Sequence, residues 1–275
     1  MIRILSNCHT HSTYCDGRST MREMVQSAVG LGFESLGFTG HAPQFFDAPY
    51  CMSPENERRY REEYGRLREE YGSRIRIWLG IERDYFSCAD PCTYDYYIAS
   101  VHYLPHHAQM TAVDGSPDCL ARLLKDRYGG NGLKLAEEYY EQLALYALTR
   151  RPLIIGHLDL VKKYNRQLEL FDEDSSDYRA LVFQTLSVIH SSGSMLEVNT
   201  GAIARGHLTV PYPSYWILSA WKQLGGGIIV SSDCHDKDKL NYAFDRMPDT
   251  LRSLGYESVS VLGKGDTLFE TLSLN

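Results

Sequence analysis

Histidines and carboxylates recur in this sequence at the points where short apolar runs end. The stretch "ILSNCHTHSTYCDG", residues 4–17, places two histidines on either side of one threonine, with an aspartate five residues later. Similar side chains end the runs "FTGH", "WLGIE", "ASVH", "IIGH" and "SSDCH". The complete set is His9, His11, Asp16, His41, Glu82, His102, His157, Asp233 and His235. Imidazole and carboxylate groups are the ligands that suit Zn, Mn or Fe, so the set predicts a metal site.

The spacing within the set brings pairs of these side chains together. Residues two apart on a strand share a face, so His9 and His11 should converge. Asp233 and His235 should converge for the same reason. Cys234 lies between the second pair and should point away, which argues against this thiol as a ligand. In parallel β/α barrels, sites are built at the rim where the strands end, and these pairs fall there.

The ordinary interpretation of a single strand-end histidine is structural, because it usually caps a carbonyl group or packs on a ring. His106, His107, His190 and His207 keep that interpretation. The set differs, because six of the ten histidines fall at equivalent ends of different strands. Nine ligands exceed the needs of one ion, which favours a centre of two to three divalent transition metal ions (Zn, Fe or Mn).

The elements that must position these residues alternate between strand and helix about seven times, which implies a parallel sheet. Periodicity alone does not separate a closed barrel from an open doubly wound sheet. No G-x-G-x-x-G or Walker loop follows a predicted strand, so a closed α/β barrel is favoured. Strands are predicted at 2–8, 35–40, 74–82, 94–104, 152–160, 194–200 and 227–235, and helices at 20–30, 53–72, 132–150, 177–191 and 213–224.

Length, charge and composition limit the class of protein. The 275 residues contain no internal repeat or long linker, so we expect a single domain over residues 1–275. The net charge of −7, with basic residues scattered among acidic ones, makes nucleic acid an improbable main partner. No run approaches the ~18 apolar residues of a membrane span, and the first residues are too polar for a signal peptide. We expect free thiols in a cytoplasmic protein, as a monomer or small homo-oligomer.

The ordered motifs resemble those of the PHP (polymerase and histidinol phosphatase) superfamily. They are His9-Thr-His11-Ser with Asp16-Gly17, then His41, "GIE", "SVH", "GHLD" and "SDCH", in the family's order from residue 9 to residue 235. The segments "SVHYLPHHAQMTAVDGSPD" and "EVNTGAIARG...VPYPS" are similar to those of the stand-alone histidinol-phosphate phosphatase branch. The resemblance implies a distorted (β/α)7 barrel, like a TIM barrel, with a trinuclear metal centre at the C-terminal rim of its strands.

The resemblance also implies how the ligands divide among the ions. The family commonly has an acidic residue before the histidine of the second motif, where this chain has Gly40. A partner that orients His41 must then come from elsewhere or be missing. The implied division gives one ion His9, His11, Glu82 and Asp233, a second ion Glu82, His102 and His157, and a third ion Asp16, His41 and His235.

The chemistry that such a centre permits is hydrolysis of a phosphate monoester. Paired divalent ions acidify a bridging water and clamp the phosphoryl oxygens, so we expect attack by a metal-bridging hydroxide. Glu82, Asp233 and His235 are catalytic in this scheme because they hold the ions. Asp159 would orient a ligand or protonate the leaving alcohol. The candidates for neutralising the phosphate are Arg205 first, in a glycine-flanked loop, and then Arg83, Lys162 and Lys163.

The leading hypothesis is a metal-dependent phosphomonoesterase that hydrolyses L-histidinol phosphate to L-histidinol and phosphate, a step of histidine biosynthesis. The alternative enzyme is a PHP phosphoesterase acting on nucleotides, nucleic acid ends or another small phosphate monoester, against which the acidic balance argues. A third hypothesis is a non-catalytic scaffold that keeps the barrel for partner contacts. Such proteins usually lose ligands, whereas this chain carries all nine.

Overall fold

The main sheet of the protein is built from consecutive parallel strands. The computed structural model describes residues 2–47 and 49–275, and within them the sheet order is β1-β2-β3-β4-β7-β8-β9-β10-β11. Neighbouring strands from β1 to β10 are parallel, and β11 runs antiparallel to β10. The strands are β1 Ser6–Asn7, β2 Ser35–Phe38, β3 Arg76–Asp84, β4 Tyr96–Ser100, β7 Ile154–Ile155, β8 Met195–Asn199, β9 Ile228–Ser231, β10 Ser258–Leu262 and β11 Phe269–Ser273.

The sheet closes at the carboxyl ends of its strands. Beyond β1 and β9, Thr10 and Cys234 form a parallel bridge. The amide of His11 donates to the carbonyl of Cys234 at 2.8 Å, and the amide of Cys234 donates to the carbonyl of His9 at 3.0 Å. The strands β1, β2, β3, β4, β7, β8 and β9 therefore form a ring at this end, which confirms the predicted distorted (β/α)7 barrel.

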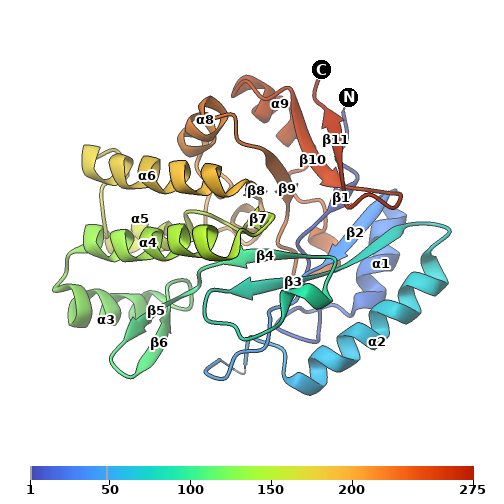
Figure 1. Cartoon of the computed structure of the whole chain (residues 1–275), viewed down its shortest axis with the longest axis horizontal. Coiled ribbons are helices and arrows are strands. Elements are labelled where there is room, and N and C mark those ends of the chain that lie inside the picture. The colour runs from blue at the N-terminus through green and yellow to red at the C-terminus, as the bar shows by residue number, and fades with distance from the viewer. Residues whose placement is uncertain (1, 48) are drawn as a thin grey trace.

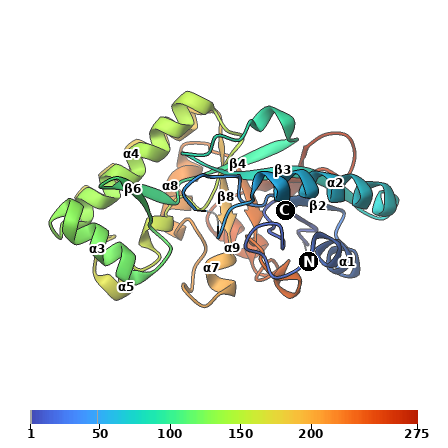
Figure 2. The same cartoon turned by 90° about the horizontal axis from the view of Figure 1, so that it is seen from below.

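Helices pack around the outside of the sheet (Figure 1). The two predicted N-caps are confirmed: Thr20 and Glu23 form a capping box, and the Ser53 side chain caps the helix that starts at Pro54. Both views place α3 and α5 at one end of the molecule and α1 and α2 at the other (Figure 2). The helices are α1 Met21–Gly30, α2 Pro54–Tyr71, α3 Pro117–Tyr128, α4 Gly132–Arg150, α5 Asn165–Leu168, α6 Ser176–Ser192, α7 Gly201–Ala204, α8 Tyr215–Gln223 and α9 Met247–Ser253.

The two faces of the sheet bury different sets of side chains. On β3, Ile77 and Leu79 join the large apolar layer beneath the helices, whereas Trp78 lies in a separate cluster inside the barrel. This follows from the alternation of side chains along a strand. The bottom of the barrel is therefore filled by apolar side chains, namely Cys8, Trp78, Tyr96, Ile98, Ile154, Ile229 and Leu262.

Some elements differ from the sequence prediction. The strand predicted over 94–104 is interrupted, because the amide of His102 donates to the Asp84 carboxylate at 2.8 Å instead of to a neighbouring strand. A separate hairpin follows, formed by β5 Tyr103–His106 and β6 Gln109–Ala112. The hairpin, α3, α9, β10 and β11 were not assigned from the sequence, and the single-domain assignment stays a prediction. None of the described helices is long and apolar enough to cross a membrane.

Candidate metal centre

All nine predicted ligands lie together at the closed rim of the barrel, with Glu82 of β3 in the middle. One carboxylate oxygen, Glu82 Oε1, lies 2.8 Å from His157 Nε2 and 3.4 Å from His102 Nε2. The Ser100 hydroxyl donates to the same oxygen at 2.7 Å. Glu82 is 1% exposed, so its carboxylate contacts protein groups instead of bulk water. An ion bound by the histidines would also contact it.

The second oxygen of Glu82 faces three further histidines. Glu82 Oε2 lies 3.2 Å from His9 Nε2 and 3.5 Å from His11 Nε2. It also lies 3.0 Å from His41 Nδ1. A single carboxylate thus lies between two groups of imidazole rings, which is the position that a ligand shared by two ions requires.

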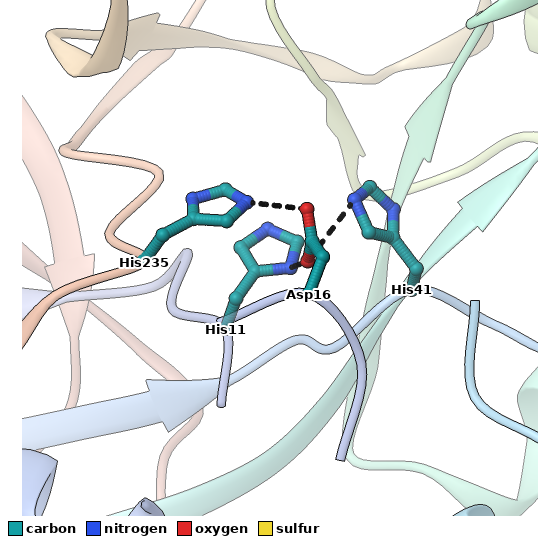
Figure 3. Close-up of side chains that lie close together, drawn as sticks. All are labelled: His11, Asp16, His41 and His235. Carbon is teal, nitrogen blue, oxygen red and sulfur yellow. Dashed lines mark hydrogen bonds and ion pairs between the residues drawn. The ribbon is translucent and has the colours of Figure 1, made fainter. Parts of the chain in front are cut away.

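Asp16 forms the centre of a second group, shown in Figure 3. Its Oδ2 atom lies 3.0 Å from His235 Nε2. Its Oδ1 atom lies 3.4 Å from His11 Nδ1 and 3.7 Å from His41 Nε2. The loop that carries Asp16 therefore meets His41 and His235 from two other segments of the rim, as the implied ion bound by Asp16, His41 and His235 requires.

Asp233 joins the two groups from the end of β9. Its Oδ1 atom lies 3.2 Å from His11 Nε2, 3.7 Å from His9 Nε2 and 3.6 Å from His235 Nδ1. Its backbone has a φ of 46°, in the left-handed region that costs a non-glycine residue energy. Backbone strain of this kind concentrates at functional sites, and here it directs the carboxylate at the histidine rings.

His41 has carboxylates at both ring nitrogens even though Gly40 supplies no acidic side chain. Its Nδ1 faces Glu82 and its Nε2 faces Asp16. A Cβ atom at position 40 would lie 3.2 Å from the Cys15 Sγ atom, so the space beside Gly40 is occupied by this thiol. The thiol itself lies 3.5 Å from His11 Nδ1.

The donor atoms at the rim fit divalent metal ions. Among the described residues, His9 Nε2, His11 Nε2 and Asp16 Oδ1 are buried without a hydrogen-bond partner. Buried polar atoms are normally satisfied, so unpartnered atoms that face other members of the set indicate ligand positions. Three groups within the set each bring their ligand atoms within 4.8 Å: His11, Asp16, His41 and His235; His9, His11 and Asp233; and His41, Glu82 and His102.

The charges within the set are strongly coupled. Burial opposes the charged form of His9, but Glu197, Glu82 and Asp233 raise its pKa to about 10. Burial also opposes the charged form of His102, and Glu82 and Asp84 raise its pKa to about 9. The carboxylates respond in the opposite direction: burial would raise the pKa of Glu82, but the surrounding histidines hold it well below the usual value. Without cations, protons therefore compensate the buried carboxylates.

Glu197 is a functional candidate that the sequence analysis missed. It lies on β8 and is fully buried. Its Oε1 atom lies 2.5 Å from His9 Nδ1, on the side of the ring opposite the other ligands. Burial would raise the pKa of Glu197, but His9 and His157 hold it below the usual value. A glutamate in the apolar run "SMLEVNT", on the strand face that points into the barrel, was the available signal.

A cavity of about 390 Å³ opens over the metal ligands. Seven of the nine predicted ligands line it, whereas His9 and His11 are fully buried. Arg205 also lines the cavity, and its Nη2 atom lies 2.9 Å from Asp233 Oδ2. Lys163 also lines the cavity, and its Nζ atom donates to the Asp114 carbonyl at 2.7 Å. Two of the four predicted phosphate-binding cations thus face the cavity.

The prediction that Arg83 faces the site is wrong. Its guanidinium donates to the carbonyls of Ala89 and Ser87 and to the hydroxyl of Tyr146, at 3.0, 2.8 and 2.9 Å. Arg83 follows Glu82 on the same strand, so the alternation of side chains sends it to the opposite face. Its role is to fix the segment after β3 against α4.

Lys162 and Asp159 also lie away from the cavity. Both are buried, and Lys162 Nζ lies 2.7 Å from Asp159 Oδ2. The same carboxylate oxygen accepts bonds from the amide and hydroxyl of Ser214, at 3.0 and 2.9 Å. Two residues apart on a strand, His157 and Asp159 would share a face, but the chain turns after His157 and the strand does not continue. Asp159 is therefore not placed to protonate a leaving group.

Other cavity residues escaped the sequence analysis. His207, which was given a structural interpretation, lines the cavity, and burial together with Lys163 and Arg205 lowers its pKa. Asp47 and Asp114 line the cavity outside the ligand set. The Tyr103 hydroxyl donates to Asp47 at 2.6 Å. Asp47, Asp114 and His207 lie on loops, which carry no periodic signal.

The chain is similar to known proteins along most of its length. Residues 7–201 match the PHP domain family. The chain is 27% identical to a probable histidinol-phosphatase of Schizosaccharomyces pombe, over 94% of this chain and 89% of that protein. It is 28% identical to the histidinol-phosphatase of Bacillus subtilis, over 86% of this chain and 96% of that protein.

A solved structure shares the fold. The histidinol phosphate phosphatase of Lactococcus lactis, determined with zinc, L-histidinol and phosphate, superposes with a TM-score of 0.70 at 20% identity. The match covers 94% of this chain and 97% of that one. The matched segment of the family, residues 7–201, includes seven of the nine rim residues. This chain belongs to the PHP family.

Proposed function

We propose that this protein is a metal-dependent phosphatase that hydrolyses L-histidinol phosphate to L-histidinol and inorganic phosphate. The observation that carries the proposal is the convergence of nine histidine and carboxylate side chains on one rim, around Glu82, beneath a cavity that the cationic side chains of Arg205 and Lys163 also line. The relatives named histidinol-phosphatase, which match along most of this chain, support the choice of substrate.

The centre would hold two to three divalent ions, of zinc, iron or manganese. One ion would be bound by His9, His11, Glu82 and Asp233, a second by Glu82, His102 and His157, and a third by Asp16, His41 and His235. Divalent ions in such a centre lower the pKa of a coordinated water and neutralise phosphoryl oxygens. The double contact of Glu82, with one oxygen toward each group of histidines, supports its assignment as the shared ligand.

The residues of the chain itself would bind and orient the substrate. Arg205 lies at the edge of the ligand set, so its guanidinium can bind two phosphate oxygens while it remains paired with Asp233. Lys163, which also lines the cavity, would supply a second positive charge. These two cations would neutralise the negative charge of the phosphate ester beside the metal ligands.

The remaining cavity wall suits a leaving group that carries an amine. Asp47 and Asp114 are carboxylates that line the cavity without belonging to the ligand set. Burial would raise the pKa of Asp114, but Lys163 and the nearby histidines lower it, so it is ionised at neutral pH. A protonated amine beside these carboxylates would be favoured over an uncharged alcohol. Tyr103 and Tyr164 provide ring surface for the imidazole.

The test is a comparison of kcat/KM for L-histidinol phosphate and glycerol phosphate, which share an alkyl phosphate but differ in the amine and the imidazole. We expect a preference of ~100-fold or more for histidinol phosphate. Equal activity on glycerol phosphate, or higher activity on nucleotides or oligonucleotide ends, would overturn the substrate assignment in favour of another PHP phosphoesterase.

A further inference from the structure

Glu197 is a buried carboxylate whose hydrogen-bonding capacity is fully used. Its Oε1 atom contacts His9 Nδ1 and accepts from the Ser231 hydroxyl, both at 2.5 Å. Its Oε2 atom accepts from the amide of His157 at 2.8 Å and from Asn199 Nδ2 at 3.0 Å. Four donors therefore meet the approximately four lone-pair positions of one carboxylate. Glu197 is thus not available as a metal ligand.

The contact with His9 determines which ring nitrogen faces the rim. An ionised carboxylate only accepts hydrogen bonds, so the proton of the neutral imidazole lies on Nδ1. The other nitrogen, Nε2, then presents its lone pair toward Glu82 and Asp233, 3.2 and 3.7 Å away. This is the arrangement in which a carboxylate orients a metal-binding histidine and increases its basicity.

The second oxygen of Glu197 reaches a different part of the centre. It holds the backbone of His157, whose ring contacts the other oxygen of Glu82. Through Asn199 it also connects to the turn that begins α7, because Asn199 Oδ1 accepts from the amide of Gly201 at 2.8 Å. Arg205 follows directly after α7. One carboxylate therefore supports histidines on both sides of Glu82 and the loop that carries the cavity arginine.

We propose that Glu197 is a positioning residue that sets the tautomer of His9 and the backbone position of His157, and so determines the affinity of two neighbouring metal positions. This inference rests on the metal centre of the proposed function, but not on its substrate. Partners of metal-binding histidines typically contribute about 10–100-fold in metal affinity.

The experiment is a titration of metal-free protein with Zn²⁺ in competition with a chromogenic chelator, followed by the absorption spectrum of Co²⁺-loaded protein. In Glu197→Gln a neutral amide replaces the carboxylate, and its NH2 group faces groups that are themselves donors, so His9 loses its charged orienting partner. We expect affinity to fall by about 10–100-fold and the cobalt bands to shift. Glu197→Asp keeps the negative charge but moves it one methylene further from His9, so its loss of zinc affinity should be smaller than that of Glu197→Gln.

The matched control is Tyr140→Phe. It removes a buried hydrogen bond of 2.9 Å between Tyr140 and Tyr178, which joins α4 to α6 away from the rim. We expect lower thermal stability with unchanged zinc affinity and cobalt spectrum. The proposal is overturned if Glu197→Gln behaves like this control. If Glu197→Gln does not fold, Glu197→Asp is measured instead. Wild-type zinc affinity and a wild-type cobalt spectrum in Glu197→Asp would then overturn the proposal. Neither titration uses histidinol phosphate, so a failed substrate assignment remains distinguishable.

Discussion

The interior of the barrel changes character between its two ends, although the same strands line both. On β3, Trp78 packs in the apolar cluster at the bottom, and Glu82 contacts the histidines four residues later. On β9, Ile229 belongs to the same cluster, and Asp233 reaches the rim four residues later. Each strand therefore contributes an apolar residue to one end and a charged residue to the other.

The apolar end of the barrel therefore serves stability, and the charged rim serves function. Apolar burial at the bottom stabilises the fold without any ligand. At the rim, buried carboxylates and imidazoles lose hydration, and their mutual attraction compensates for that loss only in part. The rim should therefore gain most from bound cations, and substitutions at the two ends should affect different measurements.

The largest effect is expected for Glu82→Gln. The substitution removes the charge that faces both groups of histidines, so we expect kcat/KM to fall by about 10³-fold or more. Phosphate release and the metal content of the same sample are the measurements. Glu138→Gln, on the surface of α4, is the control and should keep both at wild-type values. Normal activity in Glu82→Gln would remove this residue from the centre.

Trp78→Ala should lower stability and leave activity unchanged, the opposite of Glu82→Gln. Trp78 is 5% exposed, and its indole donates to the Gly263 carbonyl at 2.8 Å. We expect the free energy of unfolding to fall by about 3–5 kcal/mol, with kcat unchanged below the unfolding transition. Chemical denaturation and initial rates measure the two quantities. If the protein does not fold, Ile229→Val should lose about 0.5–1.5 kcal/mol. A folded variant that loses kcat would show that the two ends are coupled.

Arg205 and Arg83 form a matched pair of arginines on the two faces of the barrel wall. Arg205→Ala should lower kcat/KM by about 10–100-fold, the equivalent of a hydrogen bond to a charged group. Arg83→Ala should leave KM unchanged and lower stability, because its donors are used by Ala89, Ser87 and Tyr146. A fall in kcat/KM for Arg83→Ala as large as that for Arg205→Ala would contradict the placement of Arg83 outside the cavity.

The rim should also respond to pH in the absence of metal. The folded-state pKa values of His9 and His102, about 10 and about 9, lie above the unfolded value of about 6.5. Their contribution to stability is full below pH ~6.5 and is lost as pH rises through the folded values. We therefore expect the Tm of chelator-treated protein to fall between pH ~6.5 and ~9, while zinc affinity rises. A Tm that rises over this window would refute the coupling.

The smallest effect is expected for Lys163→Ala. Both cations are paired with an aspartate, but the guanidinium of Arg205 has five N–H donors and the ammonium of Lys163 has three, so Lys163 contributes less to the phosphate than Arg205 does. We expect KM to rise by a few-fold, with kcat nearly unchanged. Lys264→Ala, at an exposed pair with Glu34, is the control. A larger loss than that of Arg205→Ala would reverse the roles of the two cations.

The sequence was most informative where alternation or capping dictates the structure. The pairing of His9 with His11 and the capping of α1 by Thr20 required only local rules, and the structure has both. The parallel strands explain why distant histidines meet at one rim. The same alternation, applied to Arg83, would have excluded it from the cavity.

The parts that could not be predicted depend on breaks in regular structure. The chain turns after His157, so Asp159 pairs with Lys162 behind the wall instead of joining the site. Asp47 and Asp114 reach the cavity from loops, whose course depends on packing between distant segments. Glu197 is a different case, because it lies on a predicted strand, where a single glutamate in an apolar run already indicates a buried charge.

The most direct test of the central claim is elemental analysis of purified protein, combined with activity before and after treatment with a chelator. We expect two to three equivalents of transition metal, loss of histidinol phosphate hydrolysis on chelation, and recovery when Zn²⁺ or Mn²⁺ is returned. A folded protein that binds no transition metal, or that keeps its full hydrolytic rate after the metal is removed, would contradict the account.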